Sequence, residues 1–385
     1  MRILHCCLAS FYNEGYGYQE NILPRMHKKQ GHVVKIVAST EKFVDKINLG
    51  YVNAHTFINE DGIEVTRLPY CSCLPLKMAA KFRLYKGVEK ELQAFAPDII
   101  FMHDVQFLSI SIVANYLKQH SNVRLFVDGH TDFGNSAQTI LSKYLLHGII
   151  YRWCVNKIIP YAEKFYGTLP ARVEFFTNFY KTPKSKTELL VMGADDDLIA
   201  EVKKNHMRDK IRMKYKVKDS TLLIITGGKF DERKTSVLNL MSAVKLVSTE
   251  YDVKLLIFGS VMEGDFKQRF LELCDDEVII YSGWLNSTET YAYIEASDLV
   301  VFTGSHSVLW EQAVGQGKPC VFNRYMEQTH LDVGGNCLFL NGISVDEIYS
   351  VIIEAIRNYE RLKENAMTKG IESFSYDRIA AKAIK

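Results

Sequence analysis

The chain has 385 residues, more than a single hydrophobic core supports, and this length is typical of two domains of ordinary size. Hydrophobic residues make up 47% of the sequence and charged residues 24%, which is the balance of a folded globular protein and excludes a disordered chain. The formal net charge of +2 provides no general attraction for polyanions, so we expect no nucleic-acid partner.

The cysteines and the hydropathy pattern indicate a protein of the cell interior. The eight cysteines are scattered, and Cys6 and Cys7 lie inside an apolar segment, which favours a reducing compartment over a disulfide framework. Cys71-x-Cys73 has no second pair, so we expect no zinc site there. No apolar run approaches the length of a membrane span, and residues 1–5 open into a strand pattern rather than a signal peptide. We therefore expect a cytoplasmic protein that at most lies peripherally on the inner face of a membrane.

The first half of the chain alternates between strand and helix patterns. Strands are predicted at residues 2–8, 33–38, 61–69, 99–102, 123–127 and 188–191, and helices at 19–30, 75–95, 107–119, 136–155 and 162–166. Strands that alternate with helices build a parallel sheet. The pattern predicts a first Rossmann-like domain over residues 1–193.

Polar residues follow several strands of this first half. The loop after the first strand carries Gly15-x-Gly17 but lacks the third glycine of a dinucleotide-binding fingerprint, so it is weak evidence for a nicotinamide cofactor. His103 ends one strand, and Asp128 and His130 follow the next. Because ligands bind at the carboxyl ends of parallel strands, we predict an acid–base pair across these two ends. A polar loop that bonds its own backbone is the alternative.

The second half begins with an acidic turn and a basic segment. We predict that Asp195, Asp196 and Asp197 cap the helix that follows, and a metal-binding acidic cluster is the alternative. The basic run 203–218 is typical of a solvated helix between domains. Beyond it, strands are predicted at 221–226, 253–258, 277–281, 299–302 and 320–322, and helices at 235–249, 266–274, 287–296, 308–314, 345–359 and 371–383. This alternation predicts a second Rossmann-like domain over residues 194–370.

Three strand ends of the second half project toward one face and carry glycines, lysines and a carboxylate. They are Gly227-Gly228-Lys229 with Lys234, Gly259-Ser260, and the turn 305–307 with Glu311. Glycines let the backbone approach a phosphate closely, lysines neutralise its charge, and a carboxylate accepts hydrogen bonds from a ribose diol. The pattern therefore predicts a site for a nucleoside diphosphate. Solvated lysines beside ordinary turns are the alternative.

In chain order, these motifs resemble the donor half of family 4 glycosyltransferases. The matching residues are Gly227-Gly228-Lys229 with Lys234, Phe258-Gly259, Gly283-Trp284, Ala296-Ser297-Asp298, and Glu311-Gln312-Ala313 before Lys318-Pro319. In the first half, residues 8–20 resemble the family's glycine loop, 128–131 its acceptor-side histidine loop, and 192–195 its domain-linking segment. The resemblance covers nearly the whole chain, although each motif is short.

The resemblance implies the GT-B fold, an α/β architecture of two doubly wound Rossmann-like domains that face each other across a cleft. Residues 1–193 are then the acceptor-binding domain and residues 194–370 the donor-binding domain. The C-terminal helix, within 371–385, is expected to cross back and pack on the first domain.

The resemblance also implies a reaction. It is the transfer, with retention of anomeric configuration, of a hexosyl or N-acetylhexosaminyl group from a UDP- or GDP-linked sugar. The expected acceptor is a glycan, a lipid-linked saccharide or a polymer, as in cell-surface polysaccharide biosynthesis. No metal and no cofactor are expected, because lysines and helix N-termini neutralise the leaving diphosphate.

The functional residues are carried over by position from the same resemblance. The implied catalytic residues are His130, Lys229 and Lys234. The implied donor-binding residues are Gly15, Gly17, Gly228, Lys229, Lys234, Gly259, Trp284, Leu285, Ser307, Val308 and Glu311. The implied acceptor-binding residues are Tyr16, His103 and Asp128. In this assignment the lysines hold the diphosphate, Glu311 holds the ribose, and His130 approaches the transferred sugar.

One position departs from the family pattern. The family has a carboxylate eight residues before Glu311, where this chain has Thr303. Because that carboxylate contacts the donor sugar, the identity of the sugar stays open, and His306 is a substitute by position only. Other functions stay open too: a nucleotide-sugar 2-epimerase of the same architecture, an inactive nucleotide-sugar-binding module and, more distantly, a nicotinamide dehydrogenase.

The basic and apolar segment 76–92 raises the question of membrane contact. Its lysines alternate with large apolar side chains, a pattern that suits an anionic membrane surface. An ordinary solvated helix over the sheet is the alternative.

Overall fold

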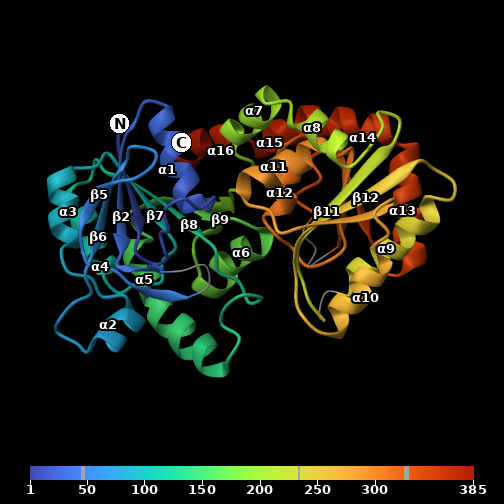
Figure 1. Ribbon diagram of the computed structural model, residues 1–385. Helices are drawn as coiled ribbons and strands as arrows, with labels where there is room; N and C mark the ends of the chain where they lie inside the picture. Colours follow the sequence, from blue (N-terminus) through green and yellow to red (C-terminus); the bar gives the residue numbers. More distant parts are fainter. Residues whose placement is uncertain (45–47, 233–234, 325–328) are drawn as a thin grey trace. The chain divides into compact units, whose positions relative to one another are not determined.

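The computed structural model describes residues 1–44, 48–232, 235–324 and 329–385. The chain divides into two compact units, one formed by Met1–Val191 with Ile379–Lys385 and the other by Met192–Arg378. Each unit is built around a mainly parallel sheet with helices (Figure 1). Of the predicted C-terminal segment 371–385, only Ile379–Lys385 belongs to the first unit. Within the described residues, no helix is both long enough and apolar enough to cross a membrane.

The first unit contains an eight-stranded sheet in the part of the chain that the structure describes. Its strands are β1 (Arg2–Cys7), β2 (Val33–Ser39), β5 (Thr56–Ile58), β6 (Glu64–Leu68), β7 (Ile99–His103), β8 (Arg124–Gly129), β9 (Ala162–Gly167) and β10 (Thr187–Leu189). Their order is β10-β9-β8-β7-β1-β2-β6-β5, and neighbouring strands are parallel except for β5, which runs antiparallel to β6. A separate antiparallel pair is formed by β3 (Glu41–Phe43) and β4 (Leu49–Tyr51).

Helices cover both faces of this sheet, because side chains alternate between the two faces along each strand. The helices are α1 (Gln19–Lys29), α2 (Leu76–Phe82), α3 (Val88–Phe95), α4 (Ile110–Gln119), α5 (Arg152–Ile158) and α6 (Pro170–Glu174), with π-helices η1 (Ser142–Tyr151) and η2 (Phe175–Tyr180) and the 3₁₀ turn η3 (Lys184–Lys186). Leu4 and Cys6 of β1 pack in the core that α3, α4 and α5 share, whereas Cys7 belongs to a cluster on the opposite face. His5, on that opposite face, bonds to His27 of α1.

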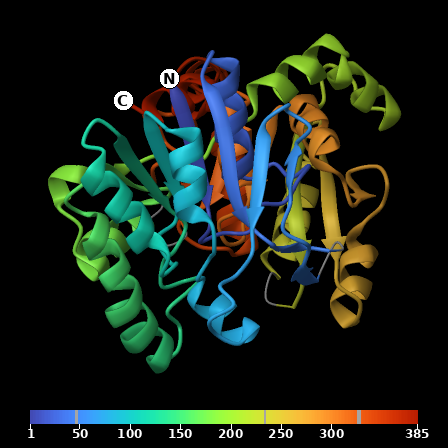
Figure 2. The same ribbon diagram turned by 90° about the vertical axis from the view of Figure 1, so that its left-hand side faces the viewer.

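The end of the chain belongs to the first unit and is anchored through backbone carbonyls. In α16 (Tyr376–Ala383), the carbonyl of Ala380 accepts a hydrogen bond from His27 Nε2 at 2.9 Å. The Arg124 guanidinium donates to the Lys385 carbonyl at 2.8 Å. The two termini therefore lie close together, as both views show (Figures 1 and 2).

The second unit contains a six-stranded, fully parallel sheet within the described residues. Its strands are β11 (Leu222–Phe230), β12 (Val253–Val261), β13 (Ile279–Gly283), β14 (Leu299–Phe302), β15 (Cys320–Asn323) and β16 (Cys337–Leu340), in the order β13-β12-β11-β14-β15-β16. Its helices are α7 (Asp196–Lys204), α8 (Met207–Lys214), α9 (Ser236–Val247), α10 (Asp265–Leu273), α11 (Ser287–Ala296), α12 (Leu309–Gly315), α13 (Val345–Arg357), α14 (Tyr359–Asn365), the π-helix η4 (Ala366–Gly370) and α15 (Ile371–Phe374).

This second sheet is also covered on both faces. Ile224 of β11 and Val301 of β14 pack in one core with residues of α9, α10 and α13. Phe302 points the other way and stacks on Trp310 of α12, with ring centroids 6.2 Å apart. Both units are thus doubly wound, as the sequence predicts.

The order of the strands reverses once in each sheet. In the first unit the chain adds strands on one side of β1 and then returns to add β7 on the other side. In the second unit the same reversal separates β11 from β14. The loops that follow the two strands at such a switch point diverge, which leaves room for a ligand at the carboxyl edge.

Several predicted elements differ from the structure. Residues 162–166 form strand β9 rather than a helix, because they pair in parallel with both β8 and β10. The predicted helix 75–95 breaks into α2 and α3, where Arg83 and Gly87 adopt left-handed backbone conformations. By contrast, the predicted capping by Asp195 is confirmed, since its carboxylate accepts from the backbone N–H groups of Asp197 and Leu198.

The glycines after the predicted strand 221–226 lie in the sheet rather than in a loop. Strand β11 continues to Phe230, and Gly228 pairs with Gly259 of β12. Gly259 has a φ of +123°, and a Cβ there would lie 1.8 Å from the Gly228 carbonyl oxygen. The two backbones can approach this closely only because Gly259 lacks a side chain.

We predict that Gly259→Ala destabilises the second unit more than Gly264→Ala does. Gly264 has a similar φ of +120°, but a Cβ there would have no neighbour within 4 Å. The control should cost about 1–3 kcal/mol of unfolding free energy for backbone strain alone. Gly259→Ala should cost about 1–3 kcal/mol more because the new methyl group collides with backbone. Urea unfolding measures both values, and equal losses would contradict the close approach of β11 and β12.

Candidate functional site

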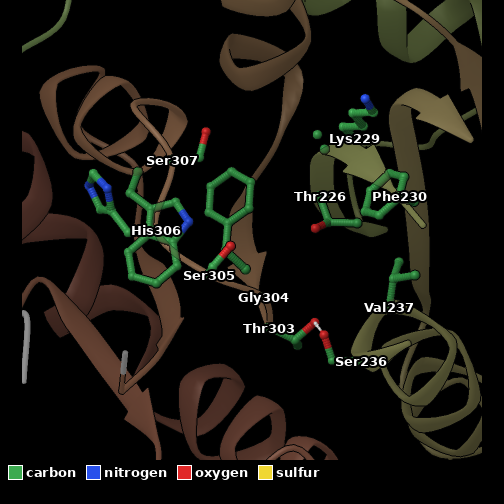
Figure 3. Close-up of a pocket in the computed structure, with 14 residues that line it drawn as sticks. Thr226, Lys229, Phe230, Ser236, Val237, Thr303, Gly304, Ser305, His306 and Ser307 are labelled. Atoms are coloured by element: carbon green, nitrogen blue, oxygen red, sulfur yellow. Dashed lines mark hydrogen bonds between the residues drawn. The ribbon is translucent and has the colours of Figure 1, made fainter. Parts of the chain in front are cut away.

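A pocket of about 310 Å³ opens at the switch point of the second sheet. It lies between the carboxyl ends of β11 and β14 and the start of α9. The lining residues are Thr226, Gly227, Gly228, Lys229, Phe230, Ser236, Val237, Phe302, Thr303, Gly304, Ser305, His306, Ser307 and Trp310. Figure 3 shows β11 residues on one side of the pocket and the loop 303–307 on the other.

The pocket is suited to an anion. Lys229 is an exposed cation among its lining residues. Ser236 and Val237, the first residues of the long helix α9, also line it, so the positive end of that helix dipole faces the pocket. The described residues provide no side-chain cap for this helix start. Its backbone N–H groups can therefore donate to a bound phosphate.

Thr303 lies at the base of this pocket, where the resemblance implies a carboxylate. Its side chain is buried, and its Oγ1 donates to Ser236 Oγ at 3.2 Å (Figure 3). The threonine thus joins the end of β14 to the start of α9. It adds no negative charge to a site that otherwise favours anions.

Glu311 is fully buried next to the pocket and has two histidine partners. Its Oε1 lies 2.7 Å from His306 Nε2 and 3.4 Å from His330 Nε2. Burial alone would raise the pKa of Glu311, but the two histidines hold that pKa below its usual value. The other oxygen, Oε2, is buried and has no hydrogen-bond partner among the described residues. Glu311 is therefore an ionised carboxylate that retains one free acceptor oxygen.

The other predicted donor residues are only partly brought together. Gly228, Lys229 and Ser307 line the pocket, while Val308 adjoins it in sequence. Gly259 lies one strand away in β12, and its carbonyl accepts a hydrogen bond from the Tyr281 hydroxyl at 2.7 Å.

Two further donor residues, Trp284 and Leu285, are not among the described lining residues. Trp284 and Leu285 follow β13, two strands from β11, and the Trp284 side chain is exposed. Lys234 lies outside the described residues.

The first unit carries a buried chain of hydrogen-bonded histidines at its own switch point. The chain starts at the Ala380 carbonyl, which accepts from His27 Nε2 at 2.9 Å. His27 Nδ1 lies 3.0 Å from His5 Nε2, and His5 Nδ1 lies 3.0 Å from His103 Nε2. The chain ends where His103 Nδ1 meets Asp128 Oδ2 at 2.9 Å. The three rings are buried and cross from α1 through β1 to β7.

The direction of this chain is fixed because a carbonyl oxygen can only accept. His27 must carry its proton on Nε2, and since burial lowers its pKa to about 4 it is neutral and accepts at Nδ1. Burial also lowers the pKa of His5, so His5 donates to His27 and accepts from His103. At the other end of the chain, His103 and His130 hold the pKa of Asp128 below its usual value although burial alone would raise it, so Asp128 Oδ2 accepts from His103 Nδ1.

Asp128 also holds His130, the residue implied to approach the transferred sugar. His130 Nε2 lies 3.6 Å from Asp128 Oδ1, and its backbone N–H donates to Asp104 Oδ2 at 3.4 Å. Burial favours the neutral ring, but the nearby Asp128 charge outweighs burial and raises the pKa of His130 to about 9. Gln19 of α1 donates to Asp128 Oδ2 at 2.9 Å and positions the carboxylate. His130 is therefore a cation at neutral pH.

The glycine loop of the first unit is an exposed turn. Gly15 has a φ of +75°, and its N–H donates to the Glu60 carboxylate at 2.7 Å. Gly17 is exposed. Tyr16 stacks on Phe43 with ring centroids 6.1 Å apart.

Comparisons with known proteins identify the fold. No family model matches the chain, and no curated protein matches it by sequence. A glycosyltransferase from Rickettsia africae matches with a TM-score of 0.67 at 12% identity, over 99% of this chain and 96% of that one. HepE of Anabaena in complex with UDP matches with a TM-score of 0.66 at 17% identity, over 99% and 98% of the two chains. A protein from Listeria monocytogenes designated as a UDP-N-acetylglucosamine 2-epimerase matches with a TM-score of 0.60 at 12% identity, over 99% and 94%.

The chain has the GT-B fold. The predicted architecture of two doubly wound parallel-sheet units is confirmed by these matches. At identities of 12–17% the likeness concerns the fold, and the reaction has to be inferred from the site.

One cluster in this GT-B chain has the composition of a metal centre. His103 Nδ1, an Asp128 oxygen and His130 Nε2 lie within 4.8 Å of one another, and all are atom types that bind Zn²⁺. However, the 2.9 Å between His103 and Asp128 is a hydrogen-bond length, and the direction of the histidine chain puts a proton between these atoms. We therefore assign the cluster as a hydrogen-bonded pair of His103 and Asp128 beside His130.

Sequence reasoning missed the residues that surround the predicted ones. His5 and His27 support His103, and His330 supports Glu311. A polar residue such as His5 inside an apolar strand has to find a buried partner, and this was the available signal. The partner's identity could not be read from the chain, because His103 is 98 residues away.

We predict that the stability of this GT-B protein falls between about pH 6.5 and pH 9 because of His130. The pKa of His130 is about 9 in the folded state, against about 6.5 for an unfolded histidine. Its stabilising contribution is therefore complete below pH 6.5 and is lost as the pH rises through 9. Melting temperatures of the wild type and of His130→Gln should differ most near pH 6 and converge near pH 9.5.

The control for this measurement is His55→Gln, at an exposed histidine of the same unit. The control variant should follow the wild-type pH profile. A melting-temperature difference that stays constant from pH 6 to pH 9.5 in His130→Gln would contradict the assignment of a protonated His130.

Proposed function

We propose that this protein is a glycosyltransferase that moves a sugar from a nucleotide diphosphate sugar to a glycan, lipid-linked saccharide or polymer acceptor. The observation that carries the proposal is the anion-suited pocket at the switch point of the second sheet, with the ionised Glu311 beside it. In open α/β sheets this is the position where nucleotides bind.

The diphosphate of the donor occupies the pocket. Lys229 provides a positive charge, the first turn of α9 provides N–H donors, and the loop 303–307 closes the opposite side. These groups stabilise the negative charge that develops as the diphosphate leaves, and this supports a mechanism without a metal. Lys234 is proposed as a second cation by position in the sequence.

The ribose of the donor lies against Glu311. The free oxygen of this carboxylate can accept a hydrogen bond from a ribose hydroxyl, and the histidines on the other oxygen keep the group ionised and fixed. We propose a uridine nucleotide, which the complex of HepE with UDP supports. Gly259, Trp284, Leu285 and Val308 are proposed to surround the nucleoside.

The transferred sugar lies near His130, which we propose as a charged hydrogen-bond donor rather than a general base. A base would have to accept a proton, whereas Asp128 keeps this ring protonated. In the reaction, the bond from the anomeric carbon to the diphosphate oxygen breaks and a bond to the acceptor oxygen forms on the same face. The acceptor proton passes to the departing diphosphate.

The finer assignments belong to the same proposal. We propose membership of glycosyltransferase family 4, a hexosyl or N-acetylhexosaminyl donor, and a cytoplasmic location with peripheral membrane contact. Tyr16, His103 and Asp128 are proposed on the acceptor side, and Gly15 and Gly17 near the phosphate.

A second candidate is a nucleotide-sugar 2-epimerase. The specific observation in its favour is the match to the Listeria monocytogenes protein of that designation. Epimerisation needs no acceptor, so the two functions separate in a simple assay.

Ligand binding and turnover test the proposed function. Thermal-shift measurements with UDP, GDP and ADP identify the base, since a ligand that binds the folded state raises the melting temperature. The protein is then incubated with the matching nucleotide sugars, with and without glycan acceptors, and products are followed by NMR. We expect acceptor-dependent transfer with retained anomeric configuration that EDTA does not change. An epimerised donor without acceptor would establish the second candidate instead.

Lys229→Ala should reduce the melting-temperature shift that the nucleotide causes and should lower turnover by about tenfold or more. The reason is the loss of a charge-assisted hydrogen bond to phosphate. Lys210→Ala, at an exposed lysine of the same unit, is the matched control and should keep wild-type values. Equal activity of the two variants would exclude the pocket as the diphosphate site.

We predict that Glu311 accepts a hydrogen bond from the 2′-hydroxyl of the ribose. The wild type should bind UDP more tightly than 2′-deoxy-UDP, by about tenfold to a hundredfold for one lost hydrogen bond to a charged group. Glu311→Gln should bind the two nucleotides with nearly equal affinity, as measured by calorimetry. A variant that keeps the full preference for UDP would place the ribose elsewhere.

A further inference from the structure

The first unit exposes a row of large apolar side chains on one helical segment. Ile140 is 81% exposed, Leu141 64%, Tyr144 62% and Ile149 63%. Leu145 and Trp153 are exposed by 44% and 43%. A monomeric globular protein does not usually leave so many neighbouring apolar side chains in water unless the surface binds something. We call these six residues, Ile140, Leu141, Tyr144, Leu145, Ile149 and Trp153, the apolar face.

The winding of the segment explains why these residues share one side. Ser142–Tyr151 is a π-helix, and the N–H of Arg152 bonds to the His147 carbonyl five residues before it. In such a helix, side chains four to five positions apart lie on the same side. Tyr144, Ile149 and Trp153 follow this spacing, and His147 and Tyr151 between them are buried. The segment is therefore amphipathic, with its buried side on the core and its apolar face outward.

The charged side chains of the segment that carries the apolar face have a single sign. Residues 133–162 contain no aspartate or glutamate, but they include Lys143, Arg152 and Lys157. Lys157 lies over the Trp153 ring at 5.0 Å, and Lys143 lies 5.6 Å from the Tyr144 ring centroid. The ammonium groups therefore lie beside the aromatic rings, which places positive charge next to the apolar face.

A second segment with exposed lysines, helix α2, lies at the same end of the first unit as the apolar face. Helix α2 exposes Leu76 and Met78, and Lys77 and Lys81 are exposed beside them. Figures 1 and 2 show α2 and the helix that carries the apolar face at the same end of the first unit.

We propose that the apolar face is a docking surface for an anionic lipid bilayer. Apolar side chains enter the boundary between headgroups and acyl chains, and Trp153 and Tyr144 lie at headgroup level, where amphipathic rings are favoured. Lys143, Arg152 and Lys157 contact anionic headgroups. The absence of acidic residues from the segment matches this partner. The surface differs from the segment 76–92 considered from the sequence, which contributes only its exposed α2 part.

Vesicle sedimentation with the full chain tests the proposal. The wild type should partition onto vesicles of phosphatidylcholine with phosphatidylglycerol and much less onto pure phosphatidylcholine, and added salt should weaken the binding. The triple variant Ile140→Ser/Leu141→Ser/Ile149→Ser should lose more than about tenfold in partition, because apolar area no longer enters the bilayer. All three side chains are exposed, so the variant should melt like the wild type.

The matched control replaces three exposed apolar residues of the second unit, Met213→Ser/Leu246→Ser/Leu271→Ser, and should bind vesicles like the wild type. Arg152→Gln/Lys157→Gln should lose roughly 25-fold on anionic vesicles, since each basic residue near the surface contributes about fivefold. Lys203→Gln/Lys210→Gln is the control for charge.

Two results would overturn the proposal. One is a wild-type protein that partitions no more strongly onto anionic vesicles than onto neutral ones, or a triple variant that partitions as strongly as the wild type. The other is a wild-type dimer, seen by analytical ultracentrifugation, that does not bind vesicles and is absent in the triple variant. The apolar face would then be an interface between two copies of the chain. Neither result depends on nucleotide binding, so the donor pocket is tested separately.

Discussion

In a parallel sheet every strand ends at the same edge, and each later strand is added on one side or the other of the first strand. Where the side of addition changes, the loops after two neighbouring strands turn in opposite directions and leave the edge between them open. Both units of this protein contain one such reversal, between β1 and β7 and between β11 and β14. The candidate donor pocket lies at the second reversal, and the histidine chain crosses the first. The positions of both sites follow from this single constraint on strand order.

Each unit also buries a carboxylate, and in both units the neighbours of that carboxylate are histidines. Asp128 is buried beside His103 and His130, and Glu311 is buried beside His306 and His330. An ionised carboxylate in a protein interior is costly unless cations and hydrogen bonds surround it. Histidines contact both carboxylates, and their rings also pack against apolar neighbours. The result is a fixed negative charge in each unit with one oxygen that has no hydrogen-bond partner among the described residues.

The two carboxylates nevertheless have different surroundings. Asp128 lies at one end of a chain of hydrogen-bonded histidines whose other end is a backbone carbonyl in α16. Glu311 adjoins a pocket lined by His306, Lys229 and the start of α9, where positive charge dominates. The first arrangement holds a cationic His130 in place, and the second leaves an acceptor beside an anion site.

The sequence by itself determined the fold class and the position of most strands, because period-two and continuous apolar patterns report burial directly. It also pointed to Lys229, Glu311, Asp128 and His130, since polar residues after buried strands end up at the ligand-binding edge of a parallel sheet. It failed at residues 162–166, where a short segment of mixed polarity suited a helix as well as the inner strand β9, and at Gly227-Gly228, where turn-forming residues continue β11. Only the tertiary structure decided which polar residues are partners: His5 with His27 and His103, or Glu311 with His330. These contacts join residues about 20 to 100 positions apart, and a hydrogen bond between distant segments depends on packing that no local pattern encodes.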